Sequence, residues 1–139
     1  MSIVADASVV LAWFFDEDHT PQALEVLRRI EKEGLLVPPL LWSELENGIL
    51  TGEKKGLKRL AESEAFLKLV RDLPMETDER PRRRVSDEIL DIGRRFQLTS
   101  YDATYVELAW RESVSLATFD RAMRTCAKSM KIRLIPASN

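Results

Sequence analysis

The chain begins with a short apolar segment that ends at a single acid. Residues 3–5 (Ile-Val-Ala) contain nothing polar, and Asp6 follows them directly. A run of this kind predicts a strand buried on both faces, as in a parallel sheet covered by helices. Because open α/β sheets bind ligands at the carboxyl ends of their strands, Asp6 is expected beside a crevice. Asp is also a good N-cap, so the alternative that Asp6 only caps the next helix is open at this point.

Short apolar runs and periodic apolar stripes alternate along the chain. The expected strands lie at residues 2–5, 35–37, 115–118 and 132–135, with 75–77 as an edge strand. The expected helices lie at residues 21–33, 40–51, 57–73, 82–96, 101–111 and 121–129. This alternation predicts an α/β fold, a single domain over residues 1–139 with a central parallel sheet flanked by helices. The helix pair at residues 40–73 departs from the alternation and is a candidate lid or partner surface.

Composition removes several classes of function. Lys and Arg total 21 against 23 Asp and Glu, a net charge of −2, which is not the balance of a protein that binds many phosphates by itself. Cys126 and His19 are the only residues of their types, which excludes an internal disulfide and argues against zinc sites and histidine-based triads. The glycines form no phosphate-binding loop. Chemistry is therefore expected from carboxylates, together with a metal.

The same composition sets an expectation for the compartment. With 32% charged and 45% hydrophobic residues, the chain resembles an ordinary globular domain. The N-terminus lacks the order of a signal peptide, and no apolar run is long enough to span a bilayer. We therefore expect a cytoplasmic protein that makes no membrane contact.

Four acids are predicted to meet at one edge of the sheet. Asp6 and Asp120 each follow a core strand, Glu44 lies in the helix after the second strand, and Asp102 begins the helix before the next core strand. Each alone has a simpler explanation as a cap, a helix-dipole partner or a solvated side chain. Together they would repel by roughly 3 kcal/mol per pair at about 5 Å and an effective dielectric near 20. A cation would relieve this repulsion, and oxygen ligands without His or thiol select Mg²⁺ or Mn²⁺.

The residues around these acids resemble the successive motifs of one family. They are Asp6 after the first strand, Trp42-Ser43-Glu44-Leu45-Glu46-Asn47, Tyr101-Asp102-Ala103, and Leu116-Ala117-Thr118-Phe119-Asp120-Arg121. In this order and spacing they resemble the PIN-domain ribonucleases. Within that superfamily the chain is most similar to the VapC toxins of type II toxin–antitoxin modules.

The resemblance implies a PIN-like three-layer fold and a Mg²⁺- or Mn²⁺-dependent endoribonuclease, a hydrolase that cleaves RNA. It also implies a homodimer and inhibition by a small VapB-type antitoxin. By position, it assigns catalysis and metal binding to Asp6, Glu44, Asp102 and Asp120, and supporting roles to Ser8, Asn47 and Thr118. The loop at residues 128–131 lacks the glycine often found there in the family.

Two alternatives stay open. The chain is either a nuclease or a non-catalytic binding module whose acids hold a structural metal or a basic partner residue.

The dense basic run Arg82-Arg83-Arg84 also has two interpretations. Arg83 and Arg84 are spaced to pair with Asp87 and Glu88 on a solvated helix face. Three cations at a helix N-terminus oppose the helix dipole, however, which favours RNA binding through phosphates.

Overall fold

The computed structural model describes residues 2–15 and 20–137. Within these residues, five strands form one all-parallel sheet in the order β3-β2-β1-β4-β5. The strands are β1 (Ile3–Ala5), β2 (Leu35–Val37), β3 (Met75–Thr77), β4 (Ser115–Ala117) and β5 (Leu134–Ile135). The predicted parallel sheet is confirmed, with β3 at its edge. The single histidine, His19, lies outside the described residues.

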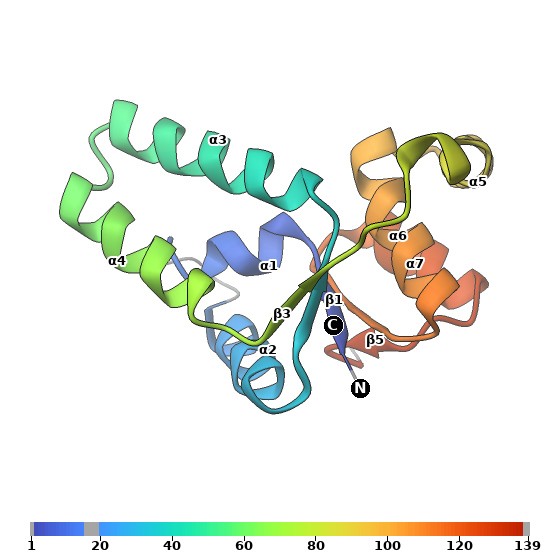
Figure 1. Cartoon of the computed structure of the whole chain (residues 1–139), viewed down its shortest axis with the longest axis horizontal. Helices are drawn as coiled ribbons and strands as arrows, with labels where there is room; N and C mark the ends of the chain where they lie inside the picture. Colours follow the sequence, from blue (N-terminus) through green and yellow to red (C-terminus); the bar gives the residue numbers. More distant parts are fainter. Residues whose placement is uncertain (1, 16–19, 138–139) are drawn as a thin grey trace.

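Helices connect the strands and cover both faces of the sheet. In the described part of the chain they are α1 (Ala7–Ala12), α2 (Thr20–Glu33), α3 (Leu40–Lys54), α4 (Leu60–Arg71), a 3₁₀ turn η1 (Arg82–Arg84), α5 (Ser86–Phe96), α6 (Ser100–Glu112) and α7 (Arg121–Ser129). Helices α1 to α4 lie on one side of the sheet and α5 to α7 on the other (Figure 1). This confirms the three-layer α/β fold. None of these helices is long and apolar enough to cross a membrane.

The order of the strands places a switch point between β1 and β4. From β1 the chain adds β2 and β3 in one direction and β4 and β5 in the other. Every residue of β1, β2 and β4 is buried, as the apolar runs predict. Because the register pairs Ala5 with Ala117, β1 and β4 end level with each other. Ligands of doubly wound sheets bind at this kind of position.

Two predicted boundaries of the helix pair are wrong. Helix α3 continues to Lys54 because Gly52 does not end it. A Cβ at Gly52 would meet the Phe15 ring at 3.0 Å, so the glycine serves close packing rather than a turn. Helix α4 begins only at Leu60, because the N–H groups of Leu57 and Lys58 turn back to the Gly52 carbonyl.

The helix expected at residues 82–96 is also divided. Arg82–Arg84 form the separate turn η1, and α5 begins at Ser86. The Ser86 hydroxyl donates to the Arg82 carbonyl at 3.1 Å, which takes an acceptor that a continuous helix would use. The other predicted boundaries agree within two residues. In the loop without glycine, Lys131 adopts φ +61°, the left-handed region that glycine enters without strain.

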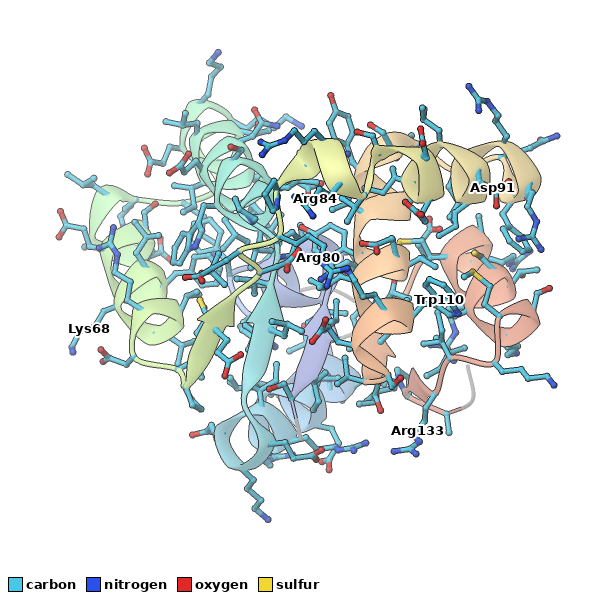
Figure 2. All side chains as sticks on the ribbon, turned by 45° about the vertical axis from the view of Figure 1, so that its right-hand side comes forward. Lys68, Arg80, Arg84, Asp91, Trp110 and Arg133 are labelled. Atoms are coloured by element: carbon cyan, nitrogen blue, oxygen red, sulfur yellow. The ribbon has the colours of Figure 1, made fainter. Side chains whose placement is uncertain are left out.

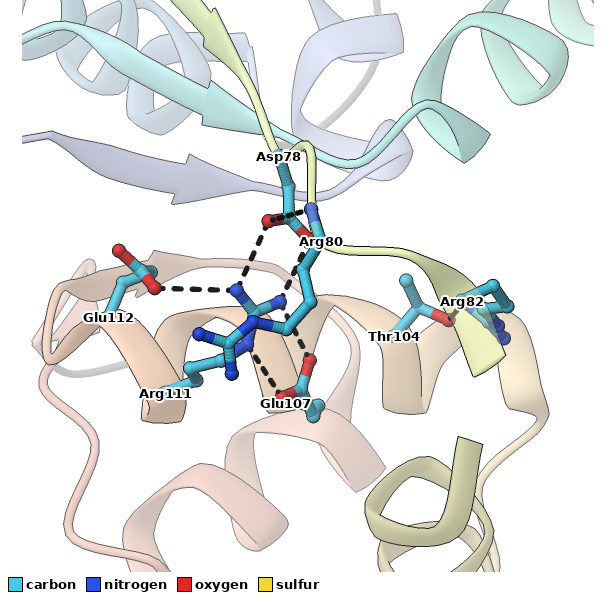
Figure 3. A network of polar contacts seen from close by, with 7 residues as sticks. All are labelled: Asp78, Arg80, Arg82, Thr104, Glu107, Arg111 and Glu112. Atoms are coloured by element: carbon cyan, nitrogen blue, oxygen red, sulfur yellow. Dashed lines mark hydrogen bonds and ion pairs between the residues drawn. The ribbon is translucent and has the colours of Figure 1, made fainter. Parts of the chain in front are cut away.

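A largely buried ion-pair network joins the segment after β3 to α6, whereas charged residues such as Lys68 project outward (Figure 2). Arg111 donates to both carboxylate oxygens of Asp78, at 3.1 and 2.8 Å, and to both of Glu107, at 2.9 and 3.2 Å (Figure 3). Hydrogen bonding to Asp78 and Glu107 raises the pKa of Arg111, and Arg111 lowers the pKa of Asp78. The network therefore fixes the residues after β3 on the helix that carries Asp102.

Replacing Arg111 with Met is expected to destabilise the protein, because it leaves the carboxylates of Asp78 and Glu107 without their cation. The expected loss in the free energy of unfolding is roughly 3–5 kcal/mol, measured by urea denaturation at about pH 7. Arg95→Met is the control: it breaks an exposed pair with Asp91 and should cost less than about 1 kcal/mol. Equal, small losses for the two variants would contradict a stabilising role for the network.

Candidate active site

The carboxylate of Asp6 is buried at the end of β1, where it accepts three hydrogen bonds. The hydroxyls of Ser8 and Thr118 donate to its two oxygens, each at 2.6 Å, and the backbone N–H of Val9 donates at 3.1 Å. The Val9 contact makes Asp6 the N-cap of α1. Asp6 therefore caps α1 and also lies at the switch point of the sheet. Both predicted hydroxyl residues lie against Asp6.

Thr118 connects Asp6 to Asp120 across the ends of β1 and β4. Its hydroxyl donates to Asp6 and accepts a hydrogen bond from the backbone N–H of Asp120 at 3.0 Å. The Asp120 carboxylate accepts from the N–H of Met123 at 2.8 Å and so caps α7. One buried hydroxyl thus sets the relative positions of two of the predicted acids.

Glu44 lies on α3, one turn from its start, and is partly buried rather than solvated. Tyr105 on α6 donates its hydroxyl to the Glu44 carboxylate at 2.5 Å. Burial, aided by Glu44, raises the pKa of Tyr105, so its hydroxyl remains a donor. Sequence analysis missed Tyr105. Its spacing of three residues from Asp102, on one face of a helix, is the signal that could have found it.

Asp102 interacts electrostatically with the other acids. It lies in the first turn of α6, where Thr99 caps the helix by accepting the Asp102 N–H at 3.1 Å. Burial raises the pKa of Asp102, and the charge of Asp120 raises it further. Asp102 in turn contributes to the raised pKa values of Asp6 and Glu44. Four carboxylates therefore act on one another at the carboxyl edge of the sheet.

Burial dominates the electrostatics of Asp6. It raises the pKa of this carboxyl to about 6, although the hydrogen bonds from Ser8, Thr118 and Val9 oppose the rise. Burial also raises the pKa of Glu44. Since the local donors do not offset desolvation, a positive charge at this edge would stabilise the ionised carboxylates.

The acids do not form a ready-made metal cage. In residues 2–15 and 20–137, no three His, Cys, Asp or Glu side chains are grouped closely enough to hold a metal ion. Asn47 is exposed on α3 one turn after Glu44, and within the described chain no hydrogen bond joins it to an acid. The guanidinium of Arg82, a predicted RNA-binding residue, donates a hydrogen bond to the Thr104 hydroxyl.

Arg124 is a second residue that sequence analysis missed. It is 4% exposed and donates to the carbonyls of Thr118 and Pro136 at 2.9 and 2.7 Å. Burial lowers its pKa. Its hydrogen bond to the Thr118 carbonyl joins α7 to the end of β4, next to the acids. No sequence signal marks it, since a basic residue on an amphipathic helix is normally exposed.

The chain matches the PIN domain family over residues 3–129, and it belongs to that family. PIN domains are generally nucleases and typically use divalent metals. The family and the three-layer fold inferred from the four acidic motifs are therefore confirmed.

Two solved structures share this fold across almost the whole chain. PAE2754 from Pyrobaculum aerophilum is 22% identical with a TM-score of 0.66, and the match covers 98% of this chain and 90% of that one. FitAcB from Neisseria gonorrhoeae is 12% identical with a TM-score of 0.65, and the match covers 96% of each chain. No curated protein matches by sequence. At these identities the likeness shows the fold alone.

Asp6 is expected to make the stability of the EDTA-treated protein depend on pH. Its pKa is about 6 in the folded chain against an ordinary value of 3.8, so the ionised form costs stability above pH 6. The cost, about 3 kcal/mol, disappears as the pH falls from about 7 to about 4. Asp6→Asn should therefore be more stable than wild type at neutral pH and lose this advantage in acid.

Urea denaturation between about pH 4 and pH 7 measures this difference, with the exposed substitution Asp91→Asn as the control that should show little pH-dependent change. A difference between wild type and Asp6→Asn that stays constant across this range would contradict the burial effect. An Asp6→Asn chain that is unfolded at neutral pH would show that the capping of α1 by Asp6 contributes more to stability than its burial costs.

Proposed function

We propose that this protein is a metal-dependent endoribonuclease that acts as the toxin of a toxin–antitoxin pair. RNA phosphodiester bonds would be hydrolysed at the edge that carries Asp6, Glu44, Asp102 and Asp120. One observation carries the proposal: Asp6 is a buried carboxylate with a pKa of about 6, at the switch point of a PIN fold and within electrostatic reach of Asp102. The general nuclease character of PIN domains supports the same class of chemistry.

The donor chemistry fits a hard divalent cation. Asp6, Glu44, Asp102 and Asp120 supply only oxygen, and under-compensated carboxylates of this kind favour Mg²⁺ or Mn²⁺. These four residues would hold the cation directly or through water. Bound there, it would neutralise charge on the phosphate and lower the pKa of the attacking water.

The surrounding residues would orient the acids. Ser8 and Thr118 each hold one oxygen of Asp6, which leaves the carboxylate in a single orientation. Tyr105 holds one oxygen of Glu44. The Asn47 amide, one turn beyond Glu44, would contribute a hydrogen bond to the substrate or to a water. Such pre-arranged groups stabilise charge that develops in the transition state without further reorganisation.

Purified protein is expected to cleave single-stranded RNA with Mg²⁺ or Mn²⁺ and to stop when EDTA is added. Asp6→Asn and Asp102→Asn should each lower kcat by at least about 100-fold, because each removes a charge needed at the cation. Gel electrophoresis of a labelled RNA measures cleavage, and Asp91→Asn on the outer face of α5 is the matched control. Undiminished cleavage by Asp6→Asn and Asp102→Asn would contradict the assignment of these residues to the active site. Metal binding without any cleavage by wild type would favour the non-catalytic binding module.

We also propose two protein partners, a small VapB-type antitoxin and a second copy of this chain. Leu50, Leu57 and Leu60, near the junction of α3 and α4, are 63%, 63% and 66% exposed. Neighbouring exposed leucines are typical of protein interaction surfaces. Leu50 lies on α3, Leu57 in the turn after it and Leu60 at the start of α4. Helices α3 and α4 form the pair that departs from the βαβ pattern (Figure 1).

The double substitution Leu57→Ser and Leu60→Ser is expected to weaken binding to a protein partner, because it removes apolar surface that the partner would cover. Co-purification with the product of the adjacent gene and light scattering of the chain alone measure the two partners separately. Leu90→Ser on α5, 46% exposed, is the control. Unchanged antitoxin binding and unchanged oligomeric state would exclude this surface as the interface.

A further inference from the structure

A groove of about 310 Å³ lies at the same edge of the sheet as the four acids. It runs between the segments that follow β2 and β3 and the helices α5 and α6. Its lining combines apolar side chains with two guanidinium groups: Pro38, Leu40, Val85, Ile89, Arg80 and Arg82. A volume of this size is at the small end for ligand pockets and suits one nucleotide.

The arginines of residues 80–84 lack carboxylate partners. No ion pair in the described chain includes them, and the pairs considered for Arg83 with Asp87 and Arg84 with Glu88 are not formed. The reason is local, since residues 82–84 form a separate 3₁₀ turn and do not share helical spacing with α5. Arg80 and Arg84 lie on the segment that leads from β3 to α5 (Figure 2). Four guanidinium groups are therefore available to an anion.

The acids near the groove are already engaged. Asp78 and Glu107 line it, but both bind Arg111 through paired hydrogen bonds (Figure 3). Asp78 also interacts with Arg80, through its charge and through the Arg80 backbone N–H at 3.3 Å, but it forms no ion pair with the Arg80 guanidinium. The lining therefore holds two guanidinium groups and two carboxylates, but Arg80 and Arg82 form no ion pair with these carboxylates.

Arg82 is held in place by a hydrogen bond to helix α6. Its guanidinium donates to the Thr104 hydroxyl at 2.8 Å (Figure 3). That hydroxyl donates to the Ser100 carbonyl at 2.6 Å. Asp102 is two residues before Thr104 on α6, so the two side chains leave the helix on different faces. On the opposite wall, Leu40 lies four residues before Glu44 on α3, which is one helical turn. The groove therefore adjoins the acidic site along α3.

We propose that this groove holds one nucleotide of a single-stranded RNA next to the scissile phosphate, with Arg80 and Arg82 as the phosphate contacts. The proposal rests on the ribonuclease function proposed above. Planar guanidinium groups match phosphate geometry, and the apolar lining provides a surface for a base or ribose. The groove thus offers two guanidinium groups without ion pairs in a chain whose net charge is −2. Arg82 is pre-oriented by Thr104, which lowers the entropic cost of binding.

The salt dependence of RNA binding tests the phosphate contacts. Fluorescence anisotropy of a labelled single-stranded RNA in EDTA measures affinity without cleavage, from low to physiological salt. Arg80→Gln and Arg82→Gln are each expected to weaken binding several-fold and to reduce the slope of log K against log salt by about 0.7. Arg133→Gln is the matched control, an exposed arginine at the start of β5, at the opposite edge of the sheet (Figure 2).

Thr104→Val separates the position of Arg82 from its charge. The variant keeps the charge but loses the hydroxyl that holds the guanidinium, so it should weaken RNA binding while leaving the salt slope unchanged. In cleavage assays with Mg²⁺, Arg82→Gln should raise KM more than it lowers kcat. Effects on kcat alone would contradict a binding role.

Failure of the two proposals can be told apart. RNA binding that depends on Arg80 and Arg82, without cleavage by wild type, would support the groove and overturn the ribonuclease function. Cleavage with the same KM in both arginine variants as in Arg133→Gln would overturn the groove and leave the function standing. If Arg80→Gln and Arg82→Gln lose antitoxin binding but bind RNA like wild type, the groove would bind an acidic protein segment. That result would overturn the nucleotide proposal.

Discussion

The buried carboxylate of Asp6 is the constraint on which the rest of the site depends. It ends β1, begins α1 through the Val9 N–H, and reaches β4 through the Thr118 hydroxyl. Thr118 in turn receives the N–H of Asp120, where α7 begins. Two segments that are far apart in sequence, β1–α1 and β4–α7, are thereby joined at one carboxylate. The cost of this arrangement is desolvation, which raises the pKa of Asp6 to about 6.

Helix α6 carries this arrangement outward to the rest of the molecule. Three of its residues contact different partners. Asp102 interacts with the other acids, and Tyr105 donates to Glu44 on α3. Glu107 binds Arg111, which also binds Asp78 after β3. The network of Arg111 is structural, yet it also engages Asp78 and Glu107 so that the neighbouring Arg80 forms no ion pair.

The sequence predicts the sheet and the position of Asp6 at the end of β1 well, because each rests on a local signal. Three buried residues and a following acid are enough to predict β1 and the place of Asp6. Contacts between distant segments have no such signal. The role of Gly52 depends on the ring of Phe15, and Tyr105 becomes a site residue only because α3 brings Glu44 to it. The supporting role predicted for Asn47 and the metal itself remain predictions.

The central claim is that Asp6, Glu44, Asp102 and Asp120 share one divalent cation. Crystals of the protein grown with Mn²⁺, measured for anomalous scattering, test this most directly. We expect a manganese peak between the ends of β1 and β4, with oxygen ligands from these carboxylates or their waters, and no such peak in Asp102→Asn. A strong peak elsewhere, or none at this edge at saturating Mn²⁺, would contradict it.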